Sequence, residues 1–332
     1  MNNNINEVHP IVEEEKYDSA ENFLEDIAYG GRLYDLMKNG KYVYRGLAFD
    51  EYQLIPTALR KDCVYPDSLN LKCIEQFDIE YIQMEKEYQI LKKFFDYCDF
   101  NNLHVPTIER LRNSLFSIFN FESIVKEEWI SPDLYELAAL AQHYGLPTRL
   151  LDWTYSLLTA LYFAVSGRLR KLNEKKPTGN IVIWAFDIQM IGLMDPQNCP
   201  LHLIRPEYSG NPNLAAQKGL FTHWSIIRPI KSFVPLIVDP KIKTNRDPLD
   251  VLLQRYIDER YKDDAMHDMF HMYKMTVPAD GIFLLYSYLK NQRIDASSLF
   301  PGYYGIVKCM QEDFIFSSYK DNYCCPIKIG ID

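Results

Sequence analysis

The sequence lacks the segments that mark membrane, secreted and zinc-binding proteins. No apolar run approaches the ~18 residues that a helix needs to cross a bilayer. The first residues, 1–6, have neither the basic start nor the apolar centre of a signal peptide. The seven cysteines show no repeated Cys-x-x-Cys spacing, which argues against a disulfide framework and against a zinc site. We therefore expect a cytoplasmic protein that does not enter a membrane.

Several catalytic signatures are missing as well. The chain has no glycine-rich phosphate loop, which argues against a kinase and against a dinucleotide-binding Rossmann fold. The run 153–156 lacks the flanking glycines of a nucleophile elbow. No carboxylate cluster has metal-ligand spacing, and His267 and His271 lack a clear third ligand, so no metal site is predicted. A net charge of -9 argues against non-specific binding of nucleic acid.

What the sequence contains is enough apolar material for a large folded core. Of the 332 residues, 47% are hydrophobic and 14% aromatic, which excludes a disordered chain. Residues 1–16 are polar and acidic and are predicted to form a flexible acidic tail. No linker or low-complexity tract divides the rest, so residues 17–332 are expected to form a single domain.

Apolar periodicity and turn residues divide this domain into helices and strands. The fold class that they predict is α+β, with a mixed or antiparallel β core and a helical insertion at about residues 62–130. Helices are expected at 18–37, 75–98, 106–118, 132–143, 155–170, 247–261 and 280–289, and near the end of the chain. Strands are expected at 41–45, 149–153, 180–186, 219–224 and 233–238, with 325–331 as an edge strand.

The most informative run is 141–154, with the sequence AQHYGLPTRLLDWT, which lies between two expected buried helices. Gly145 supplies a helix stop, Pro147 prevents continuation, and Thr154 is placed to cap the next helix. Polar side chains crowd around this turn, which is more easily explained by a functional site than by a core. Asp152 could act electrostatically in such a site, or equally cap a helix or pair with Arg149. His143 could be a base or hold a hydroxyl, but the helix dipole alone would also stabilise it.

Two further motifs lie far away in the sequence. Tyr44-Arg45-Gly46 ends the first strand, where an arginine can grip a phosphate or carboxylate and a glycine lets a ligand approach the backbone. The simpler alternative is that Arg45 pairs with a structural carboxylate. Gln217 stands before Gly219 at the entrance to a strand, a placement that alone is weak because glutamine before glycine is common in turns.

Taken together, these segments resemble the FRG domain family, named after its aromatic-Arg-Gly motif. The residues that carry the resemblance are Tyr44-Arg45-Gly46, 54–56 with Arg60, 142–154, 160–164, 217–222 and 299–305. Here the run after Phe-Pro reads Gly302-Tyr303-Tyr304, which departs from the Asp-aromatic-Asp-like turn of the family pattern.

A weaker resemblance, to Arg-type ADP-ribosyltransferases, implies a mechanism with NAD as substrate and an ADP-ribosyltransferase-like fold. It implies catalytic roles for Arg45 at a phosphate, Asp152 at developing positive charge and Gln217 at the substrate. The cofactor-binding residues that it implies are Tyr44, Gly46, His143, Arg149 and Thr154. Gln217 stands where those enzymes keep a catalytic glutamate, so Asp152 or Glu207 would have to supply the charge, or the nucleotide is bound without turnover.

The function that these resemblances imply is transfer of ADP-ribose to a macromolecular acceptor, protein or nucleic acid, in a bacterial toxin or anti-phage role. An antitoxin would then be an expected partner. The alternative, from another class, is a non-catalytic sensor or interaction module of a defence system. The gathering of Arg, Asp, His and Thr favours the enzyme, and the missing glutamate favours the sensor.

Overall fold

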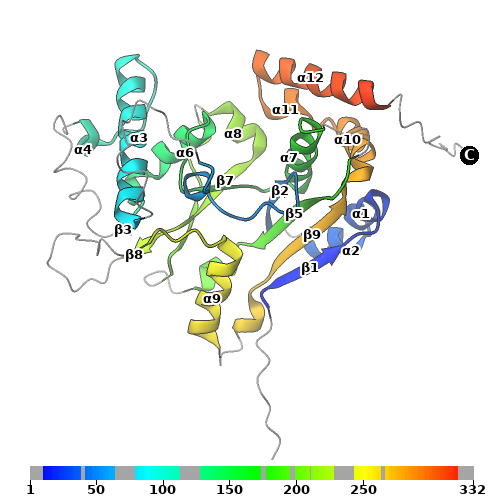
Figure 1. Ribbon diagram of the computed structural model, residues 1–332, viewed down its shortest axis with the longest axis horizontal. Helices are drawn as coiled ribbons and strands as arrows, with labels where there is room; N and C mark the ends of the chain where they lie inside the picture. The colour runs from blue at the N-terminus through cyan, green and yellow to red at the C-terminus, as the bar shows by residue number, and fades with distance from the viewer. Residues whose placement is uncertain are drawn as a thin grey trace, which may run out of the picture.

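A mixed seven-stranded sheet forms the centre of the fold (Figure 1). The structure is a computed structural model that describes residues 10–38, 42–63, 79–112, 128–172, 177–194, 199–209, 211–227, 243–262 and 266–320. The strand order is β1-β9-β5-β2-β4-β7-β6, in which β1 and β9 pair in parallel and the other neighbours are antiparallel. The strands are β1 (Val12–Lys16), β2 (Tyr42–Leu47), β4 (Leu151–Thr154), β5 (Asn180–Asp187), β6 (Leu201–Ile204), β7 (Gly219–Trp224) and β9 (Met272–Pro278). Two short strands, β3 (Glu128–Trp129) and β8 (Ile226–Ile227), form a second, antiparallel sheet.

Helices cover both faces of the large sheet, and further helices lie beyond one of its ends (Figure 1). Their bounds are α1 (Ala20–Ile27), α2 (Arg32–Met37), α3 (Glu80–Phe100), α4 (Glu109–Arg112), α6 (Tyr135–His143), α7 (Leu157–Leu169), α8 (Pro212–Gln217), α9 (Leu249–Tyr261), α10 (Ile282–Asn291), α11 (Ala296–Leu299) and α12 (Tyr303–Lys320). Among the described residues, no helix combines the length and the apolar character that crossing a membrane requires. The predicted α+β class with a mixed β core is confirmed.

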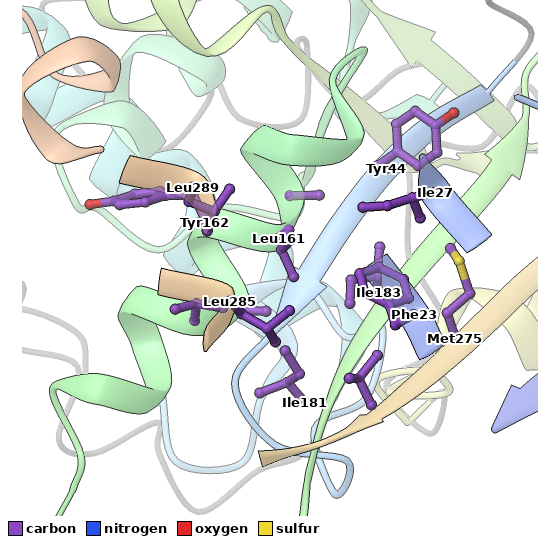
Figure 2. Packing of buried hydrophobic residues seen from close by; sticks show 14 of the residues in the cluster. Phe23, Ile27, Tyr44, Leu161, Tyr162, Ile181, Ile183, Met275, Leu285 and Leu289 are labelled. Carbon is purple, nitrogen blue, oxygen red and sulfur yellow. The ribbon is translucent and has the colours of Figure 1, made fainter. Parts of the chain in front are cut away.

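Strand β5 shows how one element serves two cores. Ile181 and Ile183 face a core shared with α1, α7 and α10, whereas Val182 and Trp184 face a core shared with α9. Successive side chains of a strand point to opposite faces of the sheet, so a strand covered on both sides reads as a continuous apolar run. Figure 2 shows the first of these cores, where aromatic and aliphatic side chains from helices and strands interlock.

The first predicted helix, 18–37, is broken in two. Ser19 caps α1 by accepting a hydrogen bond from the Asn22 amide. The chain then turns through Gly30, whose φ of +86° is a left-handed conformation that favours glycine. At Gly31 a Cβ atom would lie 2.3 Å from a backbone oxygen of the preceding helix, so the two glycines end α1 and allow α2 to start.

The predicted acidic tail differs from the structure in its last residues. Val12–Lys16 forms β1 at the edge of the sheet, and Ile11 before it is buried. The three consecutive glutamates, 13–15, remain about half exposed, and Glu14 pairs with Lys274 on β9 at 2.9 Å. Charge at an edge strand discourages pairing with other chains, so a polar sequence here is compatible with a strand. Residues 1–9 lie outside the described residues.

Two other strands, β6 and β9, were not anticipated. The run from His267 to His271 suggested one face of a helix, but it forms a 3-10 turn, His267–Met269, followed by β9. The two histidines therefore have separate partners, Asp258 for His267 and Glu13 for His271. Met272–Pro278 alternates buried and half-buried residues only in part, which weakens the period-2 signal.

Most other predicted elements are present, with small shifts at their ends. The strands at 41–45, 180–186 and 219–224 are β2, β5 and β7, and the helices at 132–143, 155–170, 247–261 and 280–289 are centred on α6, α7, α9 and α10. Of the expected helical insertion at about 62–130, the described part contains α3, α4 and β3. The strands expected at 233–238 and 325–331 lie outside the described residues.

Helix α7 lies directly against β2 because β2 has a glycine at the contact. A Cβ atom on Gly46 would lie 1.8 Å from the backbone oxygen of Ala160 and 3.0 Å from the backbone nitrogen of Ala164. Both atoms belong to the helix backbone, which cannot give way as a flexible side chain could. Gly46 therefore allows α7 to approach β2 closely.

We expect Gly46→Ala to destabilise the fold by about 3 kcal/mol, because overpacking against backbone forces the helix away from the sheet. The measurement is the free energy of unfolding in urea. Gly192→Ala is the matched control, since a Cβ atom there would meet nothing within 4 Å. Equal stability of the two variants would contradict the packing role of Gly46.

Candidate functional site

A pocket of about 250 Å³ lies where β2, β4 and β7 meet α6, α7, α8 and α11. Its lining combines polar side chains from three distant parts of the sequence with aromatic rings. Seven of the eight residues that the sequence singled out line it, namely Tyr44, Arg45, Gly46, His143, Asp152, Thr154 and Gln217. The eighth, Arg149, does not. The other lining residues are Gln142, Trp153, Ala160, Phe163, Leu214, Gly219, Leu220, Phe221 and Phe300.

The pocket opens at a gap in the sheet between β2 and β4. These strands share only one registered pair, Tyr44 with Thr154, whereas β2 pairs with β5 over its whole length from Tyr42 to Leu47. The other edge of β4 is paired with β7 along its four residues. The backbones of β2 and β4 therefore diverge beyond Tyr44, and a side chain can enter the sheet there.

Arg45 bridges this gap. Its Nη1 donates to the backbone oxygen of Asp152 at 2.7 Å and lies 2.6 Å from the Oδ1 atom of the same residue. Arg45 lies on the same face of β2 as Val43 and Leu47, whereas Asp152 alternates with Leu151 and Trp153, and all four of these apolar residues belong to the core under α9. Since side chains alternate along a strand, the guanidinium and the carboxylate leave the sheet at different faces and meet between the strands.

The two partners differ in their exposure. The Arg45 side chain is 9% exposed, while the Asp152 carboxylate remains 59% exposed at the wall of the pocket. Burial raises the pKa of Asp152, but the charge and hydrogen bond of Arg45, a backbone hydrogen bond and the charge of Arg60 together lower it below its usual value, so the carboxylate is ionised at neutral pH. The Nε atom of Arg45 is buried and has no hydrogen-bond partner in the described part of the chain.

A second arginine lies near this pair. Burial and the charge of Arg45 both lower the pKa of Arg60, whereas the charge of Asp152 raises it. Arg60 donates from Nε to the backbone oxygen of Ile55 at 3.0 Å, and it lines an open depression of about 760 Å³. Asp152 is therefore the acidic group in a cluster with two guanidinium groups.

The helix α6 brings Gln142 and His143 to the pocket. Its end follows the Schellman pattern, with the Gly145 amide donating to the Gln142 oxygen at 2.9 Å and the Leu146 amide donating to the Ala141 oxygen at 3.0 Å. Gly145 adopts a φ of +90°, as its place in the motif predicts. The helix therefore ends with both polar side chains at the pocket wall.

Gln142 and His143 have different hydrogen-bond partners. Gln142 donates from Nε2 to Oδ1 of Asp152 at 3.2 Å and accepts from the Thr148 hydroxyl. The Nε2 atom of His143 lies 2.9 Å from the Asn213 amide nitrogen, which places the proton of a neutral ring on Nδ1. Burial lowers the pKa of His143, so the ring is neutral at pH 7 and Nδ1 carries its only hydrogen.

Thr154 and Gln217 connect β4 to α8. The Thr154 hydroxyl donates to the Gln217 backbone oxygen at 2.7 Å and accepts from the Ser156 amide at 3.0 Å. Ser156, two residues later than the predicted Thr154, caps α7 by accepting from the Thr159 amide. The Gln217 side chain donates from Nε2 to the backbone oxygen of Leu299 at 3.1 Å. Both side chains line the pocket, yet each already holds two elements together.

Aromatic rings form the apolar side of the pocket. Tyr44 is buried, and burial raises the pKa of its hydroxyl, which therefore stays protonated. Phe163 and Phe300 meet edge to face with ring centroids 6.2 Å apart. A planar ligand can pack against such rings through offset or edge contacts. Phe300 and Phe163 lay within motifs of the FRG resemblance, but their sequence context did not distinguish them from core residues.

Arg149 lies in a buried ion cluster and does not reach the pocket. Its Nε is 2.9 Å from Oε2 of Glu87, and its Nη2 is 2.6 Å from Oε1 of Glu80. Glu87 also accepts from the Trp129 indole at 2.7 Å and from Gln83 at 2.8 Å. The cluster connects the turn before β4 to α3. Removing one partner would leave a buried charge without compensation, so this connection is costly to break.

His223 extends this buried network. Its Nε2 accepts from the Ile130 amide at 2.9 Å, so the proton lies on Nδ1, 3.4 Å from the Arg149 oxygen. Burial and the charge of Arg149 lower the pKa of His223 to about 3. The ring is therefore neutral and structural over most of the pH range.

Comparison with known families gives one match. Residues 40–173 match the model of the FRG domain. This range contains Tyr44, Arg45, Gly46, His143, Asp152 and Thr154, whereas Gln217 and Phe300 lie beyond it. No curated protein and no solved structure matches the chain.

The buried neutral His223 predicts a loss of stability in acid. Below pH 6.5 the unfolded chain takes up a proton at this ring, but the folded chain does so only near pH 3. Stability therefore falls as the pH drops through this window, by at most about 1.4 kcal/mol per pH unit. His223→Gln should flatten that slope in urea titrations between pH 6 and 4. The exposed His104→Gln is the control, and an unchanged slope in His223→Gln would contradict the assignment.

Proposed function

The chain carries an FRG domain and belongs to that family, and we propose that its pocket binds NAD or a related nucleotide and transfers ADP-ribose to a macromolecular target. The observation that carries this proposal is the gathering of Arg45, Asp152 and His143 in one pocket with aromatic walls. These groups are far apart in the sequence, and together they supply the donor, the anion and the base that such a transfer uses.

Binding of the phosphates would involve the two guanidinium groups. Arg45 lines the pocket, and its pair with Asp152 occupies only Nη1 among its donors. Guanidinium groups bind phosphate through charge-assisted hydrogen bonds in a fork geometry. Arg60, close enough to Arg45 for their charges to interact, is the second candidate for the pyrophosphate.

The size and the walls of the pocket suit one half of a dinucleotide. Small-molecule sites commonly enclose about 300–1,000 Å³. At about 250 Å³ the pocket would hold a nucleoside and leave the remaining half over the depression lined by Arg60. The rings of Phe163 and Phe300 would pack against the planar base, and Gln142 and His143 would bind hydroxyl groups of the ribose.

The chemistry would centre on the bond between ribose C1′ and the nicotinamide nitrogen. As that bond breaks, nicotinamide leaves with the electron pair and positive charge develops on the ribose. The ionised Asp152 carboxylate would stabilise this charge, as carboxylates do in glycoside cleavage. A nucleophile of the acceptor then bonds to C1′ and loses its proton. For that step the neutral His143 ring would need to exchange its contact with Asn213 for the incoming proton.

A second candidate function is nucleotide recognition without turnover. Gln217 carries no charge, and its amide is already bonded to Leu299. The charge of Asp152 is partly neutralised by Arg45, which weakens its effect on a developing cation. A pocket of this kind would serve a sensor or interaction module of a defence system.

The cellular setting is part of the leading proposal. Transfer of ADP-ribose to a protein or nucleic acid would disable that target, which suits a bacterial toxin or an anti-phage effector. A toxin of this kind would need an antitoxin partner in its own cell. Toxicity on induced expression that disappears in Asp152→Asn would support this setting.

Calorimetric titration with NAD tests the binding step. Replacing Arg45 by alanine should weaken binding by about 10- to 100-fold, the usual cost of a lost charged hydrogen bond. Arg45→Lys keeps the positive charge but loses the forked geometry of the guanidinium. Its affinity for NAD should therefore lie between those of the wild type and Arg45→Ala. Arg255→Ala, an exposed arginine on α9, is the matched control. No heat with the wild-type chain, or equal affinity of Arg45→Ala, would remove NAD from the proposal.

Measuring NAD consumption separates transfer from recognition. Asp152→Asn preserves the shape of the side chain and should still bind NAD, because Arg45 can donate to the amide oxygen. Its turnover should fall by about 100-fold, since the anion that stabilises the developing charge is gone. A wild-type chain that binds NAD but consumes none, with any acceptor extract, would favour the recognition function.

A further inference from the structure

The exposed face of α12 is apolar. Between Tyr303 and Tyr319, the part of this helix whose side chains are described, Lys308 and Glu312 are buried, and Asp313 is 47% exposed but paired with Lys290. The large exposed residues on this face are Tyr303, Tyr304, Ile306, Val307, Met310 and Phe314. Surface helices ordinarily show the opposite pattern, with charged residues outward and apolar residues inward.

Two charged residues of α12 point toward the protein. Glu312 is fully buried and accepts hydrogen bonds from the hydroxyls of Tyr162, at 3.0 Å, and Ser166. Lys308 is 7% exposed, and its Nζ lies 3.7 Å from the ring centroid of Phe300. The helix is thus amphipathic, but its apolar face is exposed and its charged residues contact the protein.

These inner contacts hold α12 in one rotation. Besides Glu312, Asp313 accepts from the Tyr286 hydroxyl at 2.8 Å and from Lys290 at 3.1 Å. Turning the apolar face inward would break all of these hydrogen bonds and leave buried groups on α7 and α10 without partners. The outward apolar face is therefore a stable feature of the fold.

The spacing of the exposed residues fits another helix. Tyr303, Val307, Met310 and Phe314 follow one another at intervals of four, three and four residues, which is the spacing of a coiled-coil seam. The helix lies along one edge of the molecule, above α7, α10 and α11, where a second helix can approach (Figure 1). Its 18 residues span about 27 Å at 1.5 Å per residue.

We propose that α12 pairs with α12 of a second copy of this chain and makes the protein a dimer. Pairing two identical faces around a two-fold axis matches the apolar seam with itself. The exposed apolar side chains amount to on the order of 800 Å², the area that each partner contributes to a typical stable interface.

Charge also favours a second copy over a lipid surface. Two chains with a net charge of -9 repel each other, and the cost is least where the approaching faces carry little unpaired charge; on α12 the partly exposed Asp313 is paired with Lys290. A helix that lies on an anionic membrane needs lysine or arginine beside its apolar face. On α12 the side chain of Lys308 is instead buried against Phe300.

The proposed interface begins beside the pocket. Tyr304 packs edge to face on Phe300, with ring centroids 5.9 Å apart, and Phe300 lines the pocket. The second copy would thus cover Tyr304 and restrict the movement of the pocket wall. This inference rests on α12 alone, so it stands whether or not the pocket binds NAD.

Light scattering on the full chain, over about a hundredfold range of concentration, tests the proposal. The wild-type chain should have twice its 39.0 kDa monomer mass. Met310→Glu places a charge in the centre of the seam and should raise the dissociation constant by about 100-fold or more. Val251→Glu, at a 41% exposed apolar residue of α9, is the matched control and should remain dimeric.

Circular dichroism should show both variants folded, since both side chains are largely exposed. A wild-type chain that stays at its monomer mass at every concentration would overturn the proposal, even if another protein or a vesicle binds this face. So would a dimer that Met310→Glu leaves intact.

Discussion

The gap between β2 and β4 is the constraint on which the pocket depends. The two strands pair at Tyr44 and Thr154 only, and Arg45 occupies the space that further backbone pairing would fill. A closed ladder would leave neither room for the guanidinium nor an exposed Asp152. Neighbouring features keep the gap open: Gly46 draws α7 against β2, and the Arg149 cluster fastens the turn before β4 to α3. Thr154 and Gln217 then attach α8 as the remaining wall.

The sequence predicted the pocket better than it predicted the sheet. Two local signals can be recognised without knowledge of the fold. They are the crowded polar residues beside Gly145 and Pro147 and the arginine at a strand end. Strand β1 gave no such signal, because an edge strand can be built from glutamates as long as one neighbour, β9, supplies the pairing. The break between α1 and α2 depended on two consecutive glycines, which the apolar periodicity of 18–37 concealed.

The roles of individual residues were harder to predict than their gathering. Arg149 and Asp152 are three positions apart, yet one lies in a buried ion cluster and the other at the pocket wall. Nothing local reveals this, because the carboxylates that hold Arg149 come from α3, more than sixty residues earlier. Gly46 lines the pocket, but the neighbour that needs its small size is Ala160, which the sequence did not indicate. Residue type indicates chemistry, whereas partners distant in sequence decide where that chemistry is used.

A crystal structure of the chain with ADP-ribose would test the central claim most directly. We expect electron density for the pyrophosphate within hydrogen-bond distance of Arg45, with a ribose between Asp152 and His143 and a gap between β2 and β4 that stays open. Ligand density at another surface, with the pocket empty and Arg45 still paired only with Asp152, would contradict it.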